Sequence, residues 1–181
     1  MAKKSTGLKE PKKSLKEKRN EKKLKRRKRK LSNVKISNKM IVSVLDFEEL
    51  MRLIRSVESH CSTHFRAIQQ LKANLLLADR VQPHEIPPDV VTMNSFVQLQ
   101  RNDPTELNFC IQLVYPEYGN IRDHKVSVFS ALGVAIFLRH IGDEVMYETW
   151  KTNNKVTITD IPFQPESNDN ENWENLKIYT D

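Results

Sequence analysis

The stretch Ile86–Gln100, "IPPDVVTMNSFVQLQ", marks the point where the periodicity of the chain changes. Pro87 and Pro88 introduce a new segment, and Val90-Val91 begins an extended one. Thr92-Met93-Asn94-Ser95 then interrupts the alternation of apolar and polar residues that a plain strand would show. Short polar side chains can bond neighbouring backbone groups and fix a turn. We therefore interpret these four residues as a structural turn that orients whatever precedes them, and not as a catalytic or ligand-binding motif.

The residues before this stretch have the periodicity of helices. We expect Asp46 to cap a first helix, whose apolar residues are Phe47, Leu50, Ile54 and Val57. The pattern breaks at Ser59–His64, resumes from Phe65 to Ala78, and ends at Pro83. Each helix has about 14–16 residues, which corresponds to about 21–24 Å. Two amphipathic helices joined by a short link predict a helical hairpin over residues 39–86.

After Pro88 the apolar residues recur at every second position, which is typical of strands. The expected strands are 96–101, 107–113, 125–129, 144–150 and 155–161, with a turn at 102–106 and one short buried helix over 131–140. In the second strand the residues expected to face the core are Leu107, Phe109, Ile111 and Leu113. A helical hairpin followed by a mostly antiparallel sheet that packs on one short helix is an α+β fold.

Charge is distributed unevenly along the chain. Residues 1–40 hold 18 Lys/Arg and 3 Glu, a net charge of +15, whereas the remaining residues have a net charge of −8. We expect residues 1–38 to be a disordered basic arm and residues 167–181 to be a loose acidic tail. The arm favours contact with DNA, RNA or an acidic partner surface, although a merely solubilising tail is the alternative. The residues expected to contact nucleic acid are Lys22, Lys23, Lys25, Arg26, Arg27, Lys28, Arg29 and Lys30.

Several classes of protein are excluded by what the sequence lacks. Cys61 and Cys110 make no disulfide framework, and no apolar run approaches the roughly 20 residues that cross a bilayer. We expect a monomeric cytoplasmic protein without membrane association. His60, Cys61 and His64 suit zinc chemically, but no further ligand completes a site, so no metal is expected. The sequence has no glycine-rich phosphate loop and no nucleophile with supporting residues. It therefore predicts neither an enzyme nor a cofactor.

Four segments together resemble a known family. They are "IPPDVVTMNSFVQLQ", "IQLVYPEYGN", "KVSVFSALGVAIFL" and "IGDEVMYETW". They resemble the carboxy-terminal domain shared by the Gre transcript-cleavage factors and the Rnk regulator of nucleoside diphosphate kinase. The Rnk type is most similar, because Pro-Xaa-Asp-Val-Val-Thr-Met-Asn-Ser and Leu-Val-Tyr-Pro both occur. The resemblance implies an FKBP-like domain over residues 87–166 behind the hairpin, and docking at the secondary channel of bacterial RNA polymerase.

The resemblance also implies where RNA polymerase would be contacted. The strand-to-helix junction usually reads Ser-Pro-Leu-Gly in these families; here Ser130, Leu132 and Gly133 match, and Ala131 replaces proline. Losing proline removes a fixed φ, which makes a preformed contact less certain. The alternative is that Ser130 only caps the helix, which does not exclude contact.

The predicted hairpin tip differs from that of a cleavage factor. Cleavage factors present acidic residues at this tip to hold a catalytic metal, and a hard divalent cation requires carboxylate oxygens. The tip residues here are Ser59, His60, Cys61, Ser62 and Thr63, followed by His64, and none is acidic. We therefore expect a polymerase-binding regulator without cleavage activity. The alternative is a nucleic-acid- or ribosome-associated protein in which the basic arm is the main binding element.

Overall fold

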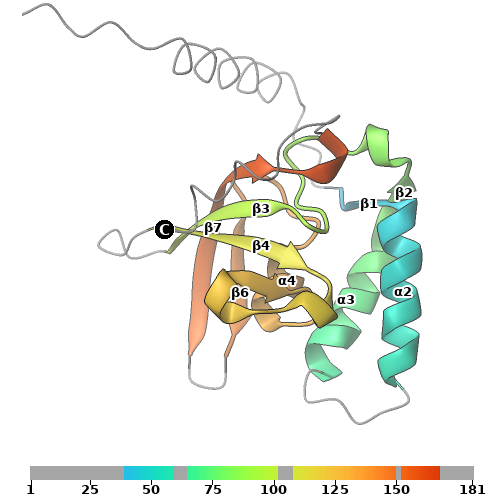
Figure 1. Cartoon of the computed structure of the whole chain (residues 1–181), viewed down its shortest axis with the longest axis horizontal. Helices are drawn as coiled ribbons and strands as arrows, with labels where there is room; N and C mark the ends of the chain where they lie inside the picture. Colours follow the sequence, from blue (N-terminus) through green and yellow to red (C-terminus); the bar gives the residue numbers. More distant parts are fainter. Residues whose placement is uncertain (1–38, 59–64, 102–107, 150–151, 168–181) are drawn as a thin grey trace, which may run out of the picture. The chain divides into compact units, whose positions relative to one another are not determined.

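The computed structural model describes residues 39–58, 65–101, 108–149 and 152–167 (Figure 1). The basic arm, the hairpin tip, the turn at 102–106 and nearly all of the acidic tail lie outside the described residues. The described residues all belong to one compact unit.

Two helices lie side by side and form the predicted hairpin (Figure 1). They are α2 (Val44–Glu58) and α3 (Phe65–Leu77). The expectation that Asp46 caps the first helix is wrong, because α2 begins two residues earlier and the Oγ of Ser43 accepts the N–H of Asp46 (3.0 Å). Serine satisfies the free N–H groups of a first turn as well as aspartate does, and the Asp46 carboxylate is bonded elsewhere.

A small parallel sheet holds the base of the hairpin together. Strand β1 (Ile41–Ser43) pairs with β2 (Asp79–Val81), so the segments before α2 and after α3 lie side by side. Lys39 forms an ion pair with Asp79 at the same place, and the guanidinium of Arg80 lies over the ring of Phe47, 4.0 Å from its centre. The chain therefore enters and leaves the hairpin at one fixed position.

The remaining strands form a five-stranded sheet in the order β5-β4-β3-β7-β6. These strands are β3 (Phe96–Arg101), β4 (Phe109–Val114), β5 (Lys125–Ser127), β6 (Glu144–Glu148) and β7 (Asn153–Phe163). All pairings are antiparallel except that of β4 with β5. Short 3₁₀ turns lie at Pro83–Glu85, Pro116–Tyr118, Ile121–Asp123 and Pro165–Ser167. The predicted α+β fold with a mostly antiparallel sheet is confirmed.

The short helix α4 (Ala131–Ile136) ends earlier than the sequence predicts. The prediction extends this helix to His140, but Leu138 takes a left-handed conformation with φ of 63°. Its N–H donates to the carbonyl of Val91 (3.0 Å), and the N–H of Val91 donates to the carbonyl of Arg139 (2.9 Å). The chain after α4 therefore turns back and pairs with the Val90-Val91 segment, which makes an isolated bridge to His140 instead of a regular strand.

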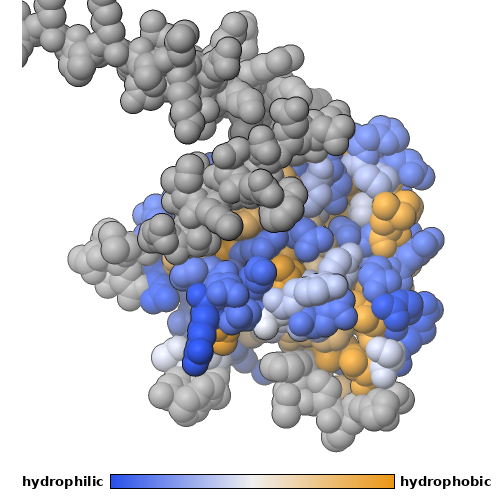
Figure 2. Space-filling model, viewed as in Figure 1, coloured by the Kyte–Doolittle hydropathy of each residue, from blue (hydrophilic) through white to orange (hydrophobic). Residues whose placement is uncertain are grey.

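The hairpin and the sheet share one hydrophobic core. Leu50, Ile54, Leu71 and Leu75 of the helices belong to the same cluster of buried side chains as residues of the sheet and of α4. The contributing residues on that side include Val97, Leu99, Ile111, Leu113, Ile136 and Ile158. Figure 2 shows apolar side chains along the two helices on the visible face. Because the core is continuous, the hairpin has a fixed orientation relative to the sheet.

The predicted inward face of β4 is confirmed where the structure describes it. Ile111 and Leu113 are buried and Phe109 is half-buried, whereas Leu107 lies outside the described residues. Among the described helices, none is both long and apolar enough to cross a membrane.

Candidate functional site

The candidate docking turn joins β5 to α4. After β5, the N–H of Phe129 donates to the Oγ of Ser127 (3.1 Å), and the N–H of Ser130 donates to the Ser127 carbonyl (2.9 Å). Ser130 is the N-cap of α4, since its Oγ accepts the N–H of Gly133 (3.0 Å). The expectation that Ser130 caps the helix is confirmed. These bonds hold the turn in one conformation, with Ala131 at the first helical position.

Gly133 is required by a close approach of two backbones. A Cβ atom at this position would lie 2.2 Å from the carbonyl oxygen of Ser127 and 2.9 Å from the Cα of Val128. Only glycine allows α4 to pack this closely on the end of β5. Ser130, Ala131 and Leu132, the other residues of the predicted contact, are half-buried. The structure thus brings these four residues together in one ordered turn, while the hairpin tip and the basic run at 22–30 lie outside the described residues.

The Thr92–Ser95 segment forms the structural turn that the sequence predicts. The Thr92 N–H donates to the Oγ of Ser95 (3.2 Å), and the two hydroxyl oxygens lie 3.0 Å apart. Asn94 has a φ of 60°, a conformation that asparagine adopts more readily than most residues. The turn is joined to β4 by bonds from the Asn94 N–H to the Leu113 carbonyl (2.7 Å) and from the Leu113 N–H to the Ser95 carbonyl (3.0 Å).

A buried carboxylate, Asp46, and a half-buried one, Glu166, make contacts that connect the hairpin and the segment after β7 to the rest of the fold. The Tyr115 hydroxyl donates to Oδ1 of Asp46 (2.9 Å), and the Thr92 hydroxyl donates to Oε2 of Glu166 (2.7 Å). Burial raises the pKa of Asp46 and of Glu166 above their ordinary values. Burial and the neighbouring Asp46 carboxylate also raise the pKa of the Tyr115 hydroxyl, so it remains a hydrogen-bond donor. These contacts fasten the first turn of α2 to the sheet.

Gln164 is a positioning residue that the sequence does not indicate. Its side chain is buried, and its Nε2 group donates to the carbonyls of Pro87 (2.8 Å) and Val90 (2.7 Å). It therefore fixes the extended segment between the hairpin and the sheet. No periodic pattern could have identified it, because its partners are distant in sequence and are backbone atoms.

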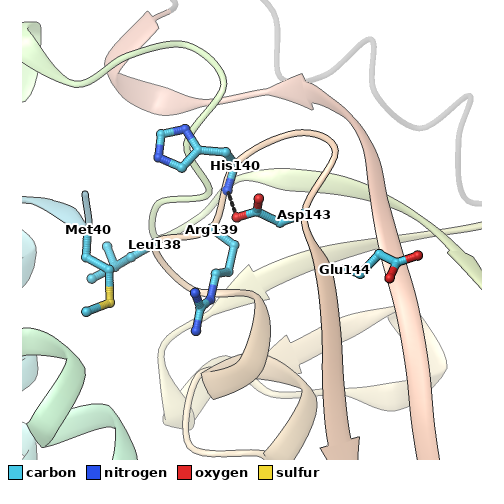
Figure 3. Close-up of a pocket in the computed structure, with 6 residues that line it drawn as sticks. All are labelled: Met40, Leu138, Arg139, His140, Asp143 and Glu144. Carbon is cyan, nitrogen blue, oxygen red and sulfur yellow. Dashed lines mark hydrogen bonds between the residues drawn. The ribbon is translucent and has the colours of Figure 1, made fainter. Parts of the chain in front are cut away.

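A cavity of about 320 Å³ lies beside the turn that follows α4 (Figure 3). Its lining residues are Met40, Leu138, Arg139, His140, Asp143 and Glu144. Oδ2 of Asp143 accepts the backbone N–H of His140 (2.9 Å), and Glu144 forms an ion pair with Lys155 (2.6 Å). Figure 3 shows the His140 ring and the Arg139 side chain pointing away from each other. The carboxylates of this cavity are thus engaged within the fold and do not converge on a common point.

The His140 ring forms a buried pair with Asp89 behind this cavity. Its Nδ1 lies 3.1 Å from Oδ2 of Asp89, and both side chains are almost fully buried. A hydrogen bond from the protonated ring to the Asp89 carboxylate raises the pKa of His140 above its ordinary value, and this effect outweighs the burial of the ring, which lowers it.

This pair predicts a pH dependence of stability. The pKa of His140 is higher in the folded protein than in the unfolded chain, so protonation of this ring stabilises the fold. This contribution to the free energy of unfolding is fully present below the pKa of the unfolded chain, about 6.5, and is lost as the pH rises through the pKa of the folded protein. We expect the free energy of unfolding to decrease over this range in the wild type. Urea unfolding at several pH values checks this, with His140→Asn as the control, because the asparagine side chain does not titrate. An equal decrease in the His140→Asn variant would contradict the assignment of this pH dependence to His140.

Within the described residues, no group of three or more His, Cys, Asp or Glu side chains could hold a metal ion. The β5–α4 turn, on a sheet that shares its core with the hairpin, is the candidate site.

Comparison with known proteins identifies the class of this sheet domain. Residues 86–163 match the family described as "Transcription elongation factor, GreA/GreB, C-term". The structure of a prokaryotic transcription elongation factor GreA/GreB from Nitrosomonas europaea superposes with a TM-score of 0.60 and 32% sequence identity. The superposition covers 69% of this chain and all of that one. The sheet domain is thus a Gre-type carboxy-terminal domain.

Two further relatives match a longer part of the chain than these 78 residues. The regulator of nucleoside diphosphate kinase of Escherichia coli (strain K12) is 28% identical over 129 residues, which are 71% of this chain and 92% of that protein. The transcription elongation factor GreA of Syntrophus aciditrophicus is 29% identical over 99 residues, which are 54% of this chain and 60% of that protein. The chain belongs to the Rnk/Gre family of bacterial transcription factors.

Proposed function

We propose that this protein is a transcription regulator that binds RNA polymerase near its secondary channel and does not stimulate transcript cleavage. Membership of the Rnk/Gre family supports a role in transcription and this kind of partner. The Ser130–Gly133 turn is the proposed contact, because its capping bonds and the close approach at Gly133 give it a single conformation before binding. A preformed surface loses less conformational entropy when it docks.

The packing of the hairpin against the sheet is the observation that carries the proposal. Arg66 lies in the first turn of α3, close to the hairpin tip, and its guanidinium reaches Oε2 of Glu148 at the end of β6 (3.0 Å). The exposed ion pair contributes little energy, but it places the first turn of α3 within reach of the end of β6, and Ile68 in the next turn belongs to the core shared with the sheet. The hairpin therefore runs along the globular domain and does not project from it.

The length of the hairpin supports the same conclusion. With 15 and 13 residues, α2 and α3 are about 22 Å and 20 Å long at 1.5 Å per residue. A cleavage factor must carry carboxylates to a metal deep in the polymerase channel. A short hairpin that packs on its own domain, with the tip sequence "SHCSTH" at residues 59–64, offers neither the reach nor the carboxylates. We propose that the protein acts by occupying the docking position.

The basic run at residues 22–30 supports a second binding activity, for DNA or RNA. Eight of its nine residues are Lys or Arg, and a single apolar residue offers no core of its own. Contacts from such a run to phosphates displace condensed counterions and carry no base specificity.

Nucleic-acid binding by the arm should therefore depend steeply on salt. If the run neutralises about six to ten phosphates, affinity for a DNA duplex should fall by about 10³–10⁵-fold between 50 and 200 mM salt. The matched control replaces its eight Lys and Arg residues with Gln and should show a clearly shallower dependence, because these are eight of the 18 basic residues of the arm. Fluorescence anisotropy checks this. Equal affinity of the unaltered chain at both salt concentrations would contradict an electrostatic interaction.

Affinity capture of RNA polymerase distinguishes the two activities. We expect the full chain and a variant that begins at Lys39 to retain RNA polymerase equally well after nuclease treatment of the lysate, because the proposed contact lies in the sheet domain. Loss of RNA polymerase only from the shortened variant would instead make the arm the main binding element.

A further inference from the structure

Two large apolar side chains on the loop before β5 are exposed to solvent. Tyr118 ends the first 3₁₀ turn of this loop and Ile121 begins the second. Their exposed fractions are 61% and 91%, and Ile121 is the most exposed large apolar residue that the structure describes. A single exposed side chain needs no explanation, but two on one short loop present apolar area that the described residues leave largely uncovered.

Hydrogen bonds hold this loop in a fixed conformation. The Asn120 side chain donates to Oδ2 of Asp123 (2.7 Å) and accepts the N–H of Arg122 (3.1 Å). The backbones of Asn120 and Lys125 exchange two further bonds, of 2.9 and 2.8 Å. Ile121 is therefore held in solvent by an ordered backbone, so its side chain is preorganised for contact with another molecule.

The loop and the Ser130–Gly133 turn are neighbours, because both pack on Ser127. A Cβ atom on Gly119 would lie 3.3 Å from the Cβ of Ser127, and a Cβ atom on Gly133 would lie 2.2 Å from its carbonyl oxygen. Gly119 lies between Tyr118 and Ile121, so a single residue of β5 supports both segments. The apolar loop is thus continuous with the proposed polymerase contact.

We propose that Tyr118 and Ile121 complete the docking surface for RNA polymerase and contact an apolar surface of the polymerase. This inference rests on the proposed function. Burial of exposed apolar area and of a tyrosine is the common source of affinity at protein interfaces. Glu117, Arg122 and Asp123 are all exposed in the same loop, which therefore has no excess of positive charge to attract a phosphate backbone. The chemistry of the loop therefore favours a protein partner over a nucleic acid.

The test uses the full chain and measures its affinity for purified RNA polymerase. We expect Tyr118→Ser combined with Ile121→Ser to weaken binding at least about 10-fold, as loss of a central interface residue does. The melting temperature should not change, because both side chains are exposed. Met146→Ser is the matched control: its side chain is 76% exposed, but it lies on β6, at the opposite edge of the sheet from β5. It should bind like the wild type.

Ala131→Arg separates this inference from the proposed function. Suppose that the wild type binds RNA polymerase, that Ala131→Arg weakens this binding, and that the double variant does not weaken it. The turn then contacts the polymerase and the loop does not, which contradicts the inference but not the proposed function. If the wild type fails to bind at all, the proposed function is wrong and the extended surface with it. If the double variant instead changes the sedimentation of the protein alone, a second copy of this chain covers the loop, which overturns the proposal.

Discussion

Replacing Gly133 with Ala is expected to lower the free energy of unfolding by about 1–3 kcal/mol, the usual cost of inserting a methyl group where none fits. The new Cβ would lie 2.2 Å from the Ser127 carbonyl oxygen, and backbone atoms of Ser127 and Val128 also lie within 3 Å. None of these is the end of a flexible side chain, so α4 itself must move away from β5. Binding to RNA polymerase should weaken as well, because the moving turn is the proposed contact.

Gly119→Ala is the matched control for this substitution. Its nearest neighbour would be the Cβ of Ser127 at 3.3 Å, and its φ of −62° suits any residue, so a small shift accommodates the methyl group. Urea unfolding of both variants should give a clearly larger loss for Gly133→Ala. Equal losses would contradict the close approach of α4 to the end of β5.

Replacing Ile111 with Ala is expected to cost about 2–5 kcal/mol of stability, whereas Gln112→Ala should change stability by no more than about 0.5 kcal/mol. Ile111 is 4% exposed, pairs with Val97 of β3 and belongs to the core shared by the sheet and the hairpin. Gln112 is the next residue of the same strand and points to the other face of the sheet. Chemical denaturation of the two variants checks the register, and equal midpoints would contradict it.

Elements that bury one face over several turns or residue pairs could be predicted from the sequence. The helices α2 and α3 and the strands β3, β4, β6 and β7 all have this property, and their periodicity gave the α+β fold. The parallel pair β1–β2 was missed, because strands of three residues have no measurable period and their pairing joins distant segments. The end of α4 was also missed, because it depends on the hydrogen bond from the Leu138 N–H to the carbonyl of Val91, and these two residues are far apart in sequence.

The candidate site was predictable to a similar extent. Ser130 and Gly133 were identified through the resemblance to the Gre and Rnk proteins, and the structure supplies the physical reasons, a helix cap at Ser130 and a close approach of two backbones at Gly133. The exposed loop at Tyr118 and Ile121 could not be identified, since the exposure of a side chain depends on the tertiary structure. Asp46 was assigned to the wrong bond for the same reason: its partner Tyr115 lies on another element.

The most direct test of the central claim is transcript cleavage in a stalled elongation complex to which a Gre cleavage factor has been added. If this protein occupies the same docking position with a hairpin that cannot supply carboxylates, increasing amounts should slow cleavage progressively, and the protein alone should stimulate none. The Ala131→Arg variant, with its proposed contact blocked, should compete less well. Cleavage stimulated by the protein alone, or undiminished cleavage at a saturating concentration of the protein, would contradict the account.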